Sequence, residues 1–458
     1  MQTDDLQKFI MSLDQAGELS RVVCPVDTHL EIAAICDAVS QGCGRGQALL
    51  FENVQGYTLP VATNLFASRK RIELALGDNV FTTLPAKLRT DLVASGAKES
   101  SLALRRVVSC RENQPVYIEE APCFSRDVSD LALTCLPALM AWPEDGGKYL
   151  TLAQVFTYHP ETNFTNCGMY RVQVVDRNRA MLRCHPGSGG AEHLAAWHER
   201  GKAMPVAIAL GGPPVMTWLA GVSLPGDVSE IDFAGYVAGH PLAMARCRDK
   251  HLAVPATAEI VLEGHVWPDE KLTEGPFANH TGRYEPAAPA PVLRIERVSL
   301  RQGAIYPCTV VGPPPRENSC LAELTVRTLL VLLQFDHPWV IDLHLPAEGV
   351  FHRAAMVAVA PDCSLSLQEI SNALWTSVLL KNSRLLILLD NDTPLSDFSA
   401  VYWRIVNANR LTEAYYADTH RVVIDARSLA GARRVEPDED IVQKITARWQ
   451  EYGLSKTN

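Results

Sequence analysis

The apolar positions at the start of the chain recur every three or four residues, which predicts an amphipathic helix over residues 6–13. Asp4 and Asp5 precede it as a cap and a first-turn acid, and Gly17 follows as a stop signal. Helices are also predicted at 27–40 and 68–76, and strands at 48–51 and 59–63. This alternation predicts an α/β unit over roughly the first hundred residues.

From about residue 115 the pattern changes to short apolar runs with few helical repeats. The run at 258–266 alternates in part between apolar and polar residues, as a half-buried strand does. Strands are predicted at 116–118, 152–158, 169–175, 181–184, 205–210, 258–267 and 291–300, and helices at 190–201 and 231–239. Many strands, few helices and frequent Gly and Pro indicate a central β-barrel-like domain.

A Gly-Pro-Pro-Pro segment at 312–315 cannot continue a sheet, and it indicates a boundary or a functional loop. Residues 317–334 then predict a long apolar helix, either an interdomain connector or an interface. This helix is followed by a βαβ pattern, which predicts a second α/β domain with a largely parallel sheet and then a polar helical tail after residue 436. The strands of that pattern are predicted at 339–343, 356–359 and 385–389, with a helix at 366–381 between the last two.

The length of 458 residues allows about three domains, which we expect at 1–114, 115–312 and 313–458. The formal net charge is −10, and this acidic balance argues against non-specific binding of nucleic acid, which needs a basic surface. The start of the chain has no basic segment followed by an apolar one, and no apolar run approaches the ~20 residues that cross a bilayer. We therefore expect a cytoplasmic protein of mixed α/β class.

The 12 cysteines are spread along the chain, and no two of them have Cys-x-x-Cys spacing. Zinc-ribbon and iron–sulfur sites are therefore not expected. The count is also low for a disulfide framework in a chain that can bury a large core. We expect free thiols, most of them buried.

Four segments carry side chains suited to chemistry. Asn166 offers an oxygen ligand, and Arg171 offers a bidentate clamp for an anion. His185 precedes a Gly-rich run that leads into a predicted helix, an arrangement that binds phosphate. Glu230 lies at another helix start, and Glu274 lies on a loop shaped by Gly and Pro. Each segment alone is better explained by a turn, a linker or a solvated side chain.

Taken together, these motifs resemble the UbiD-like decarboxylase family in order and spacing, over roughly residues 5–430. The resemblance implies a central split β-barrel that binds flavin. It also implies an N-terminal α/β domain and a C-terminal three-layer α/β domain through which homodimers or larger homo-oligomers form. The motifs are Asn-Cys-Gly-Met-Tyr-Arg at 166–171, the Gly-rich loop after His185, Gly-Gly-Pro-Pro at 211–214, Glu230 and Glu-Gly-Pro-Phe at 274–277.

The family binds prenylated FMN, which a separate flavin prenyltransferase supplies, together with Mn²⁺ or Mg²⁺ and in some members K⁺. The resemblance implies that Asn166, His185 and Glu230 ligate the divalent ion beside the cofactor phosphate. Amide oxygen, imidazole and carboxylate are donors that suit Mn²⁺ or Mg²⁺. The side chains implied to line the cofactor are Met169, Tyr170, Arg171, Arg183, Cys184, His185, Ser188 and Gly189.

By the same resemblance, the expected reaction is reversible decarboxylation of an aromatic, heteroaromatic or α,β-unsaturated carboxylic acid, through a covalent adduct of substrate and cofactor. Arg171 would orient the substrate carboxylate or tether nearby carboxylates, and Glu274 would take part in proton transfer. His352 and Arg353 are candidates for contact with a second polar group on an aromatic acid, although surface or core roles explain them equally well. Cys167 and Cys184 are expected as small side chains beside the flavin rather than nucleophiles.

One residue departs from the family pattern, because Asn279 stands where a second acid is usual. An amide has no proton to give near neutral pH. Three hypotheses follow: Glu274 or a water molecule protonates the product while Asn279 holds the geometry, the substrate needs a hydrogen bond from Asn279, or the site is weak or silent. The last hypothesis makes the chain a cofactor-binding homologue rather than an enzyme.

Overall fold

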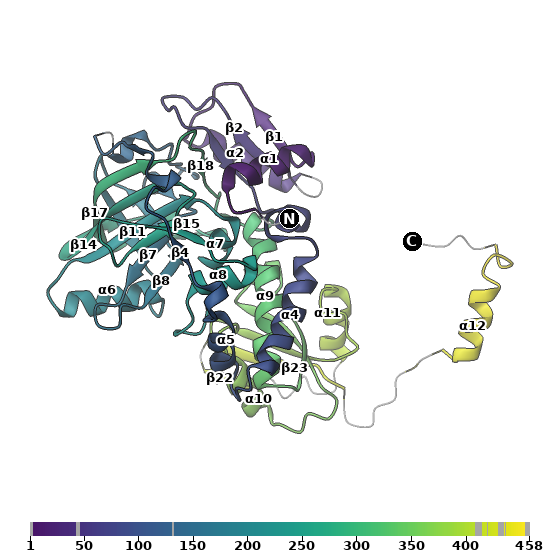
Figure 1. Ribbon diagram of the computed structural model, residues 1–458. Helices are drawn as coiled ribbons and strands as arrows, with labels where there is room; N and C mark the ends of the chain where they lie inside the picture. The colour runs from purple at the N-terminus through teal and green to yellow at the C-terminus, as the bar shows by residue number, and fades with distance from the viewer. Residues whose placement is uncertain are drawn as a thin grey trace.

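The computed structural model describes residues 3–42, 46–130, 132–407, 415–418, 420–428, 435 and 437–453. Near the N-terminus, four strands form a small sheet in the order β1-β2-β3-β18 (Figure 1). The predicted α/β unit is therefore confirmed, although β18 reaches this sheet from much later in the chain. The elements are α1 (Leu6–Gln15), β1 (Leu19–Val22), α2 (Glu31–Gln41), β2 (Ala48–Phe51), β3 (Val61–Thr63), α3 (Arg69–Leu76) and β18 (Tyr306–Pro307).

The central region is a nine-stranded sheet in which every pair of neighbours is antiparallel. The strands are β5 (Arg126–Asp127), β6 (Tyr149–Leu150), β7 (Gln154–Tyr158), β8 (Thr165–Met169), β9 (Arg171–Val174), β10 (Arg179–Arg183), β11 (Met204–Gly211), β14 (Ala258–Glu274) and β17 (Ala288–Leu300). The strand-rich prediction is confirmed here. The predicted strand at 169–175 is divided in the structure, because residues 165–169 form a strand of their own, β8, and β9 begins at Arg171.

Smaller elements surround this sheet. Strand β12 pairs with β13 on one side and with β4 on the other, and a two-stranded hairpin of β15 and β16 follows the long strand β14. Helix α6 packs on strands β7, β8, β11 and β14. The bounds are β4 (Val116–Tyr117), α6 (Gly189–Glu199), β12 (Ala243–Arg246), β13 (Ala253–Pro255), β15 (Phe277–Ala278) and β16 (Tyr284–Glu285).

A group of helices lies between the central sheet and the C-terminal region (Figure 1). It comprises α4 (Val80–Ala94), α5 (Ser100–Val108), α7 (Pro214–Leu219), α8 (Glu230–Ala238) and α9 (Glu317–Asp336). Leu324 and Leu332 of α9 belong to the large core of this helical layer, while Leu330 and Leu333 belong to the core of the C-terminal sheet. Helix α9 is therefore an interdomain connector, one of the two roles its sequence left open.

The C-terminal region is a five-stranded sheet in the order β19-β20-β21-β23-β22. Only the inner pairs are parallel, because β19 and β22 pair antiparallel with their neighbours. The expectation of a largely parallel sheet is thus wrong at both edges. Separate apolar clusters cover the two faces and give three layers. The elements are β19 (Val340–His344), β20 (Ala354–Val359), α10 (Leu367–Thr376), β21 (Leu385–Asp390), α11 (Phe398–Asn407), β22 (Tyr415–Asp418) and β23 (Arg421–Asp425).

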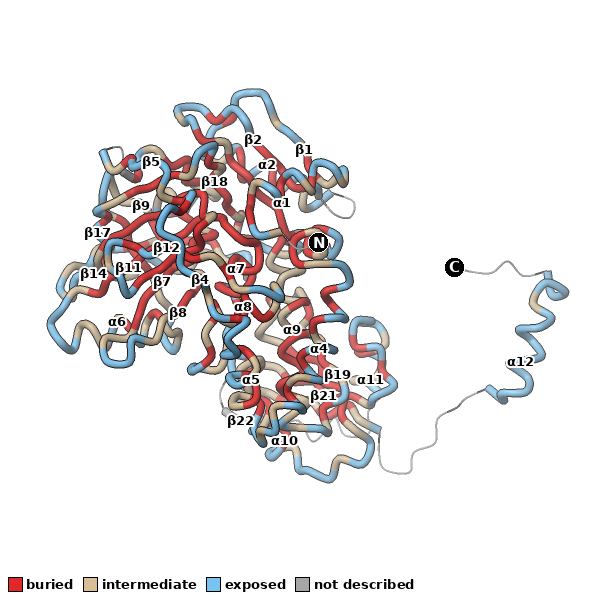
Figure 2. The backbone as a smooth tube through the Cα atoms, viewed as in Figure 1, coloured by how far each residue is buried: buried red, intermediate tan, exposed pale blue. Residues whose placement is uncertain are grey.

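The predicted helical tail is α12 (Glu439–Ala447), which lies away from the body and is almost wholly exposed (Figure 2). The cysteines that the structure describes are all free, as expected, and Cys43 lies outside the described residues. Among the helices in the described ranges, none combines the length and the apolar character needed to span a membrane.

Candidate active site

A buried carboxylate held by two arginines marks the centre of the site. Arg171 begins β9 and lies directly opposite Arg183, which ends β10. Arg171 donates from Nε and Nη2 to the two oxygens of Glu274, at 2.8 and 3.0 Å, and Arg183 donates from Nη1 at 3.1 Å. The Glu274 side chain has no exposed surface. A carboxylate buried in this way persists only where its charge is neutralised, and the two guanidinium groups do this.

The same arginine holds a second acid that no sequence motif indicated. Arg171 donates from Nη1 to Glu285 at 2.5 Å, and its guanidinium lies 4.6 Å from the centre of the Phe277 ring. Phe277 and Glu285 face each other across the β15–β16 hairpin, so one turn brings both to Arg171. Burial alone would raise the pKa of Glu285, but the hydrogen bond and the charge of Arg171 outweigh it and lower the pKa.

Asn279 points into its own turn. Its Oδ1 accepts from the backbone N–H of Thr281 at 2.8 Å and from the Thr281 hydroxyl at 2.5 Å. In the part of the chain that the structure describes, no hydrogen bond joins Asn279 to Arg171 or to Glu274. The residue that replaces the usual acid thus shapes the hairpin, and Glu285 at the end of that hairpin provides the second carboxylate.

Asn166 and Glu230 meet beside this cluster. Asn166 lies on β8, and Glu230 is the first residue of α8, whose N-cap is Ser229. Glu230 accepts from the backbone N–H of Cys167 at 3.2 Å, which places its carboxylate next to Asn166. Both side chains are buried, and burial raises the pKa of Glu230 to about 7. An amide oxygen and a buried carboxylate together suit a hard cation.

The Gly-rich loop closes over Asn166. A Cβ atom built on Gly189 would lie 2.2 Å from Asn166 Oδ1, so only glycine leaves room for that amide. The Asn166 amide nitrogen donates to the Tyr170 hydroxyl at 3.4 Å, and Gly190 N–H donates to the same hydroxyl at 3.0 Å. Oδ1 is therefore the side-chain atom of Asn166 that can bind a cation.

His185 begins this loop, and its side chain is exposed. Its carbonyl accepts from Ser188, which caps helix α6. Within the described ranges, no hydrogen bond joins the His185 ring to Asn166 or Glu230. The structure thus brings together two of the three predicted metal ligands, and the third stands at the edge of the loop.

A cavity of about 410 Å³ lies where these elements meet. Lys381 from the C-terminal region also lines it, although nothing in the sequence pointed to that lysine. Arg171, Arg183, Cys184 and His185 lie outside its wall, so the predicted lining residues divide between the cavity and the arginine cluster. The predicted residues in the wall are Asn166, Met169, Tyr170, Ser188, Gly189 and Glu230.

The residues of the cavity suit a metal-bound phosphate group. Three glycines around it approach neighbouring side chains too closely for any Cβ atom, namely Gly168, Gly189 and Gly190. The N-terminus of α6 and the ammonium group of Lys381 add positive potential to the cavity, which favours a negatively charged ligand. Among the described residues no three His, Cys, Asp or Glu side chains form a metal site, so a divalent ion here depends on the amide of Asn166.

The two cysteines of the motifs are held as thiols. Burial raises the pKa of Cys184 to about 12 and raises that of Cys167 well above its ordinary value. Thiols of this kind are poor nucleophiles, which agrees with their expected role as small side chains.

Two half-buried histidines lie together at the β15–β16 turn. His280 belongs to the β15–β16 turn and His352 to the loop before β20, and their ring centres lie 6.1 Å apart. Burial lowers the pKa of both, for His352 to about 4, so both rings are neutral near neutral pH. Nδ1 of His280 is buried without a hydrogen-bond partner in the described structure.

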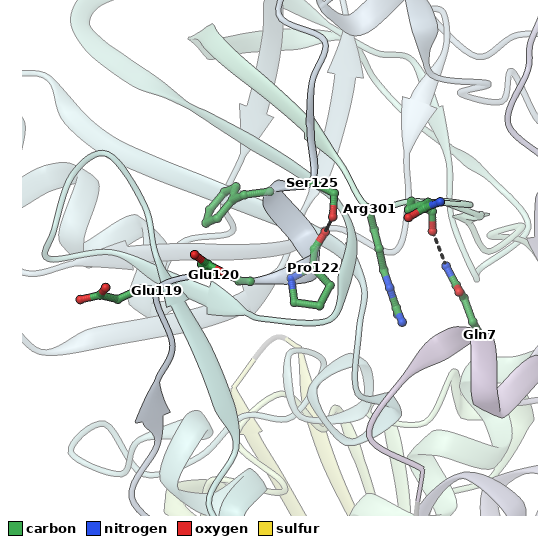
Figure 3. Close-up of a pocket in the computed structure, with 9 residues that line it drawn as sticks. Gln7, Glu119, Glu120, Pro122, Ser125 and Arg301 are labelled. Carbon is green, nitrogen blue, oxygen red and sulfur yellow. Dashed lines mark hydrogen bonds between the residues drawn. The ribbon is translucent and has the colours of Figure 1, made fainter.

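A larger hollow of about 710 Å³ lies elsewhere, between α1 and residues 119–125 (Figure 3). Arg301 in its wall is already bound by Asp5 and by Glu259. Gln7 is likewise bound, to Glu259 and to the backbone at Gln302. Among the described residues that line this hollow, no cation is therefore left unpaired for an acidic substrate.

Three family models match successive parts of the chain. Residues 10–88 match the N-terminal domain of the 3-octaprenyl-4-hydroxybenzoate carboxy-lyase family UbiD, residues 115–314 its Rift-related domain, and residues 319–427 its C-terminal domain. Among curated proteins, an uncharacterized protein of Archaeoglobus fulgidus is 35% identical over 413 residues, covering 89% of this chain and 84% of that protein. One of Aquifex aeolicus is 36% identical over 404 residues, covering 87% and 83%.

Solved structures share the fold over nearly the whole length. Vanillic acid decarboxylase of Sedimentibacter hydroxybenzoicus in its closed form has a TM-score of 0.85 at 23% identity, covering 99% of this chain and 100% of that chain. The UbiD-class enzyme HmfF of Pelotomaculum thermopropionicum in complex with prenylated FMN has a TM-score of 0.77 at 22% identity, covering 95% and 97%. The apo 3,4-dihydroxybenzoic acid decarboxylase of Enterobacter cloacae has a TM-score of 0.74 at 20% identity, covering 97% and 100%.

Proposed function

This chain belongs to the UbiD family, and from that premise we propose that it is a prenylated-FMN-dependent carboxy-lyase. The reaction is reversible, non-oxidative decarboxylation of an aromatic, heteroaromatic or α,β-unsaturated carboxylic acid. The observation that carries the proposal is the buried cluster of Arg171, Arg183 and Glu274. It provides a fixed guanidinium group for an acidic substrate next to a cavity suited to a phosphate.

We propose that Asn166, Glu230 and His185 hold a divalent ion, Mn²⁺ or Mg²⁺, which neutralises the cofactor phosphate in the cavity. The separation of His185 from the other two means that its loop must turn inward when the ion binds. Lys381 and the N-terminus of α6 add positive potential at the same place. A monovalent cation such as K⁺ remains an expectation from the resemblance alone.

When bound, prenylated FMN supplies an electron sink for the electron pair of the breaking carbon–carbon bond. The chain's own residues do the rest. Arg171 holds the substrate carboxylate, and Glu274 keeps that guanidinium in place by two hydrogen bonds. Phe277 and Tyr149, whose ring centres are 4.5 Å apart, shield the cluster from water and so strengthen its electrostatic interactions.

The substrate class follows from the neutral histidines. Uncharged imidazole rings at His280 and His352 suit hydrogen bonds to a phenolic or other neutral polar substituent rather than a second carboxylate. Structural neighbours are decarboxylases of vanillic acid and of 3,4-dihydroxybenzoic acid, which carry such substituents. We propose hydroxylated or methoxylated benzoic acids as the first substrates to test.

The test uses protein co-produced with a flavin prenyltransferase. Mass spectrometry and the visible spectrum report whether the modified flavin is bound. Release of CO₂, and uptake of deuterium at the former carboxyl carbon, are then measured with vanillic acid, 3,4-dihydroxybenzoic acid and a panel of unsaturated acids. Full flavin loading with neither release nor exchange for any acid would contradict the proposal.

The second candidate is a cofactor-binding homologue without activity, which Asn279 alone favoured. The carboxylate of Glu285 on Arg171 weakens that argument, because a second acid is present in the site. We also propose a homodimer or larger homo-oligomer with a separate prenyltransferase as cofactor supplier. Size-exclusion chromatography with light scattering tests the oligomer.

A further inference from the structure

Each nitrogen of the Arg171 guanidinium group donates to an acid of this chain. Nε and Nη2 donate to Glu274, and Nη1 donates to Glu285. A substrate carboxylate that takes the Nη1 position must therefore displace Glu285.

The two carboxylates differ in how firmly they are held. Glu274 is 0% exposed, accepts three hydrogen bonds and is bound by both Arg171 and Arg183. The side chain of Glu285 is 31% exposed, and among the described residues Arg171 is its one hydrogen-bond partner. Displacement of Glu285 therefore costs much less than displacement of Glu274.

We propose that Glu285 is a relocated second acid that exchanges with the substrate on Arg171. In the empty site Glu285 occupies Nη1 of Arg171, and the arriving carboxylate of the substrate takes its place. The released Glu285 then delivers a proton to the carbon that CO₂ leaves. This inference rests on the proposed function for its proton-transfer step, whereas the exchange on Arg171 can be measured without turnover.

The proton balance of the step is simple. The bond between the ring carbon and the carboxyl carbon breaks, CO₂ departs, and the electron pair stays with the substrate. Glu285 is ionised while it is bound to Arg171, so after its release the partly exposed carboxylate first takes up a proton from solvent. The new carbon–hydrogen bond forms with that proton and returns Glu285 to its carboxylate form, and no oxidant or reductant is needed. Release from Arg171 removes the main interactions that lower the pKa of Glu285, whereas burial, the largest effect, raises it and the charges of His185 and Arg183 still lower it.

The structure of the hairpin explains why the second acid can stand at residue 285 instead of residue 279. The Asn279 side chain is engaged in the turn by Thr281, so it is not free to reach Arg171. Glu285 is the residue that the antiparallel register places opposite Phe277, and Phe277 packs against Arg171. Nη1 of Arg171 is thus bound by a residue of β16, the second strand of the hairpin, and not by a residue of the turn.

The test compares holoprotein, co-produced with the prenyltransferase, with its Glu285→Gln and Glu285→Asp variants. Benzoate serves as an unreactive carboxylate probe, and its dissociation constant is measured by calorimetry. Turnover is measured with the best acid of the substrate panel. Glu270→Gln is the matched control, because Glu270 forms an exposed pair with Arg294 on the same sheet, outside the site.

For Glu285→Gln we expect benzoate to bind on the order of tenfold more tightly, because its competitor for Arg171 has lost its charge. We expect turnover to fall by about 100-fold or more, the usual effect of losing a general acid. Glu285→Asp keeps an acid and should recover most of that loss, and Glu270→Gln should change neither quantity.

If Glu285 only supported Arg171, benzoate affinity and turnover would fall together, because removal of the Glu285 carboxylate would weaken benzoate binding as well as lower turnover. Unchanged or weaker benzoate binding by Glu285→Gln, or turnover within about threefold of the parent, overturns the inference. If the parent converts no acid, the proposed function fails, and the benzoate measurement still decides whether Glu285 and a carboxylate exchange on Arg171.

Discussion

Substitution of Gly189 by alanine tests the proposed metal site through a single added methyl group. The new Cβ atom would lie 2.2 Å from Asn166 Oδ1 and 2.8 Å from its Cγ, below the 3.0 Å that real Cβ atoms keep. The amide of Asn166 must therefore move by roughly 1 Å, because the interior around it is close-packed. Metal–ligand distances hold to about 0.2 Å, so the displaced oxygen can no longer serve as a ligand.

We expect Gly189→Ala to bind Mn²⁺ at least about tenfold more weakly and to retain less flavin after gel filtration. The fold should survive, since residue 189 begins helix α6, where alanine is favoured over glycine. The assay is Mn²⁺ titration of the holoprotein, with flavin content from the visible spectrum and folding from circular dichroism.

Gly226→Ala is the matched control, because Gly226 lines the same cavity and a Cβ atom there would meet nothing within 4 Å. Gly189→Ala protein that binds Mn²⁺ as tightly as Gly226→Ala protein would refute the assignment of Asn166 as a ligand.

Other substitutions test the electrostatics and packing around the site. Burial holds the pKa of His193 at about 4, below its ordinary 6.5, so the stability that it contributes is complete above pH 6.5 and is lost as the pH falls toward 4, by up to about 3 kcal/mol. Urea titrations across that range should show a flatter pH dependence for His193→Gln, and an unchanged slope would contradict the assignment. Glu259→Gln removes the buried partner of Arg301 and should cost about 3 kcal/mol of unfolding free energy, measured by urea denaturation. Trp218→Phe removes the 2.9 Å hydrogen bond from the indole to Thr325 of α9 and should cost about 1–2 kcal/mol in the same assay, whereas an unaltered midpoint would mean that this bond does not tie α7 to α9.

The hydrophobic pattern was sufficient to predict most of the central sheet, because its strands are short, apolar and separated by Gly and Pro. It was less informative at the edges of the C-terminal sheet. The chain between β19 and β20 spans only residues 345–353, shorter than the dozen or so residues that a parallel crossover needs. This short loop was a sequence feature that indicated an antiparallel pair of β19 and β20. The βαβ pattern of the following strands favoured a parallel pair instead.

The site shows a similar division. The motifs that contain Arg171, Asn166 and Glu230 can be recognised in the sequence; the structure places Arg171 in the arginine cluster and the other two in the wall of the cavity. Glu285 reaches the arginine cluster through the register of a hairpin. Lys381 reaches the cavity through the packing of a distant region of the chain. No local pattern in the sequence encodes such tertiary proximity.

Lys381 gives the cavity one further property. Its wall is built mainly from β8, the start of α6 and residues 220–230, but this lysine comes from the loop between α10 and β21. An anion in the cavity is therefore held by two parts of the molecule that have separate apolar cores. Its binding free energy adds to the association of those parts, by RT ln(1 + [L]/Kd). Occupancy of the cavity thus acts as a non-covalent cross-link, and amide exchange in the C-terminal sheet should slow as the ligand concentration rises.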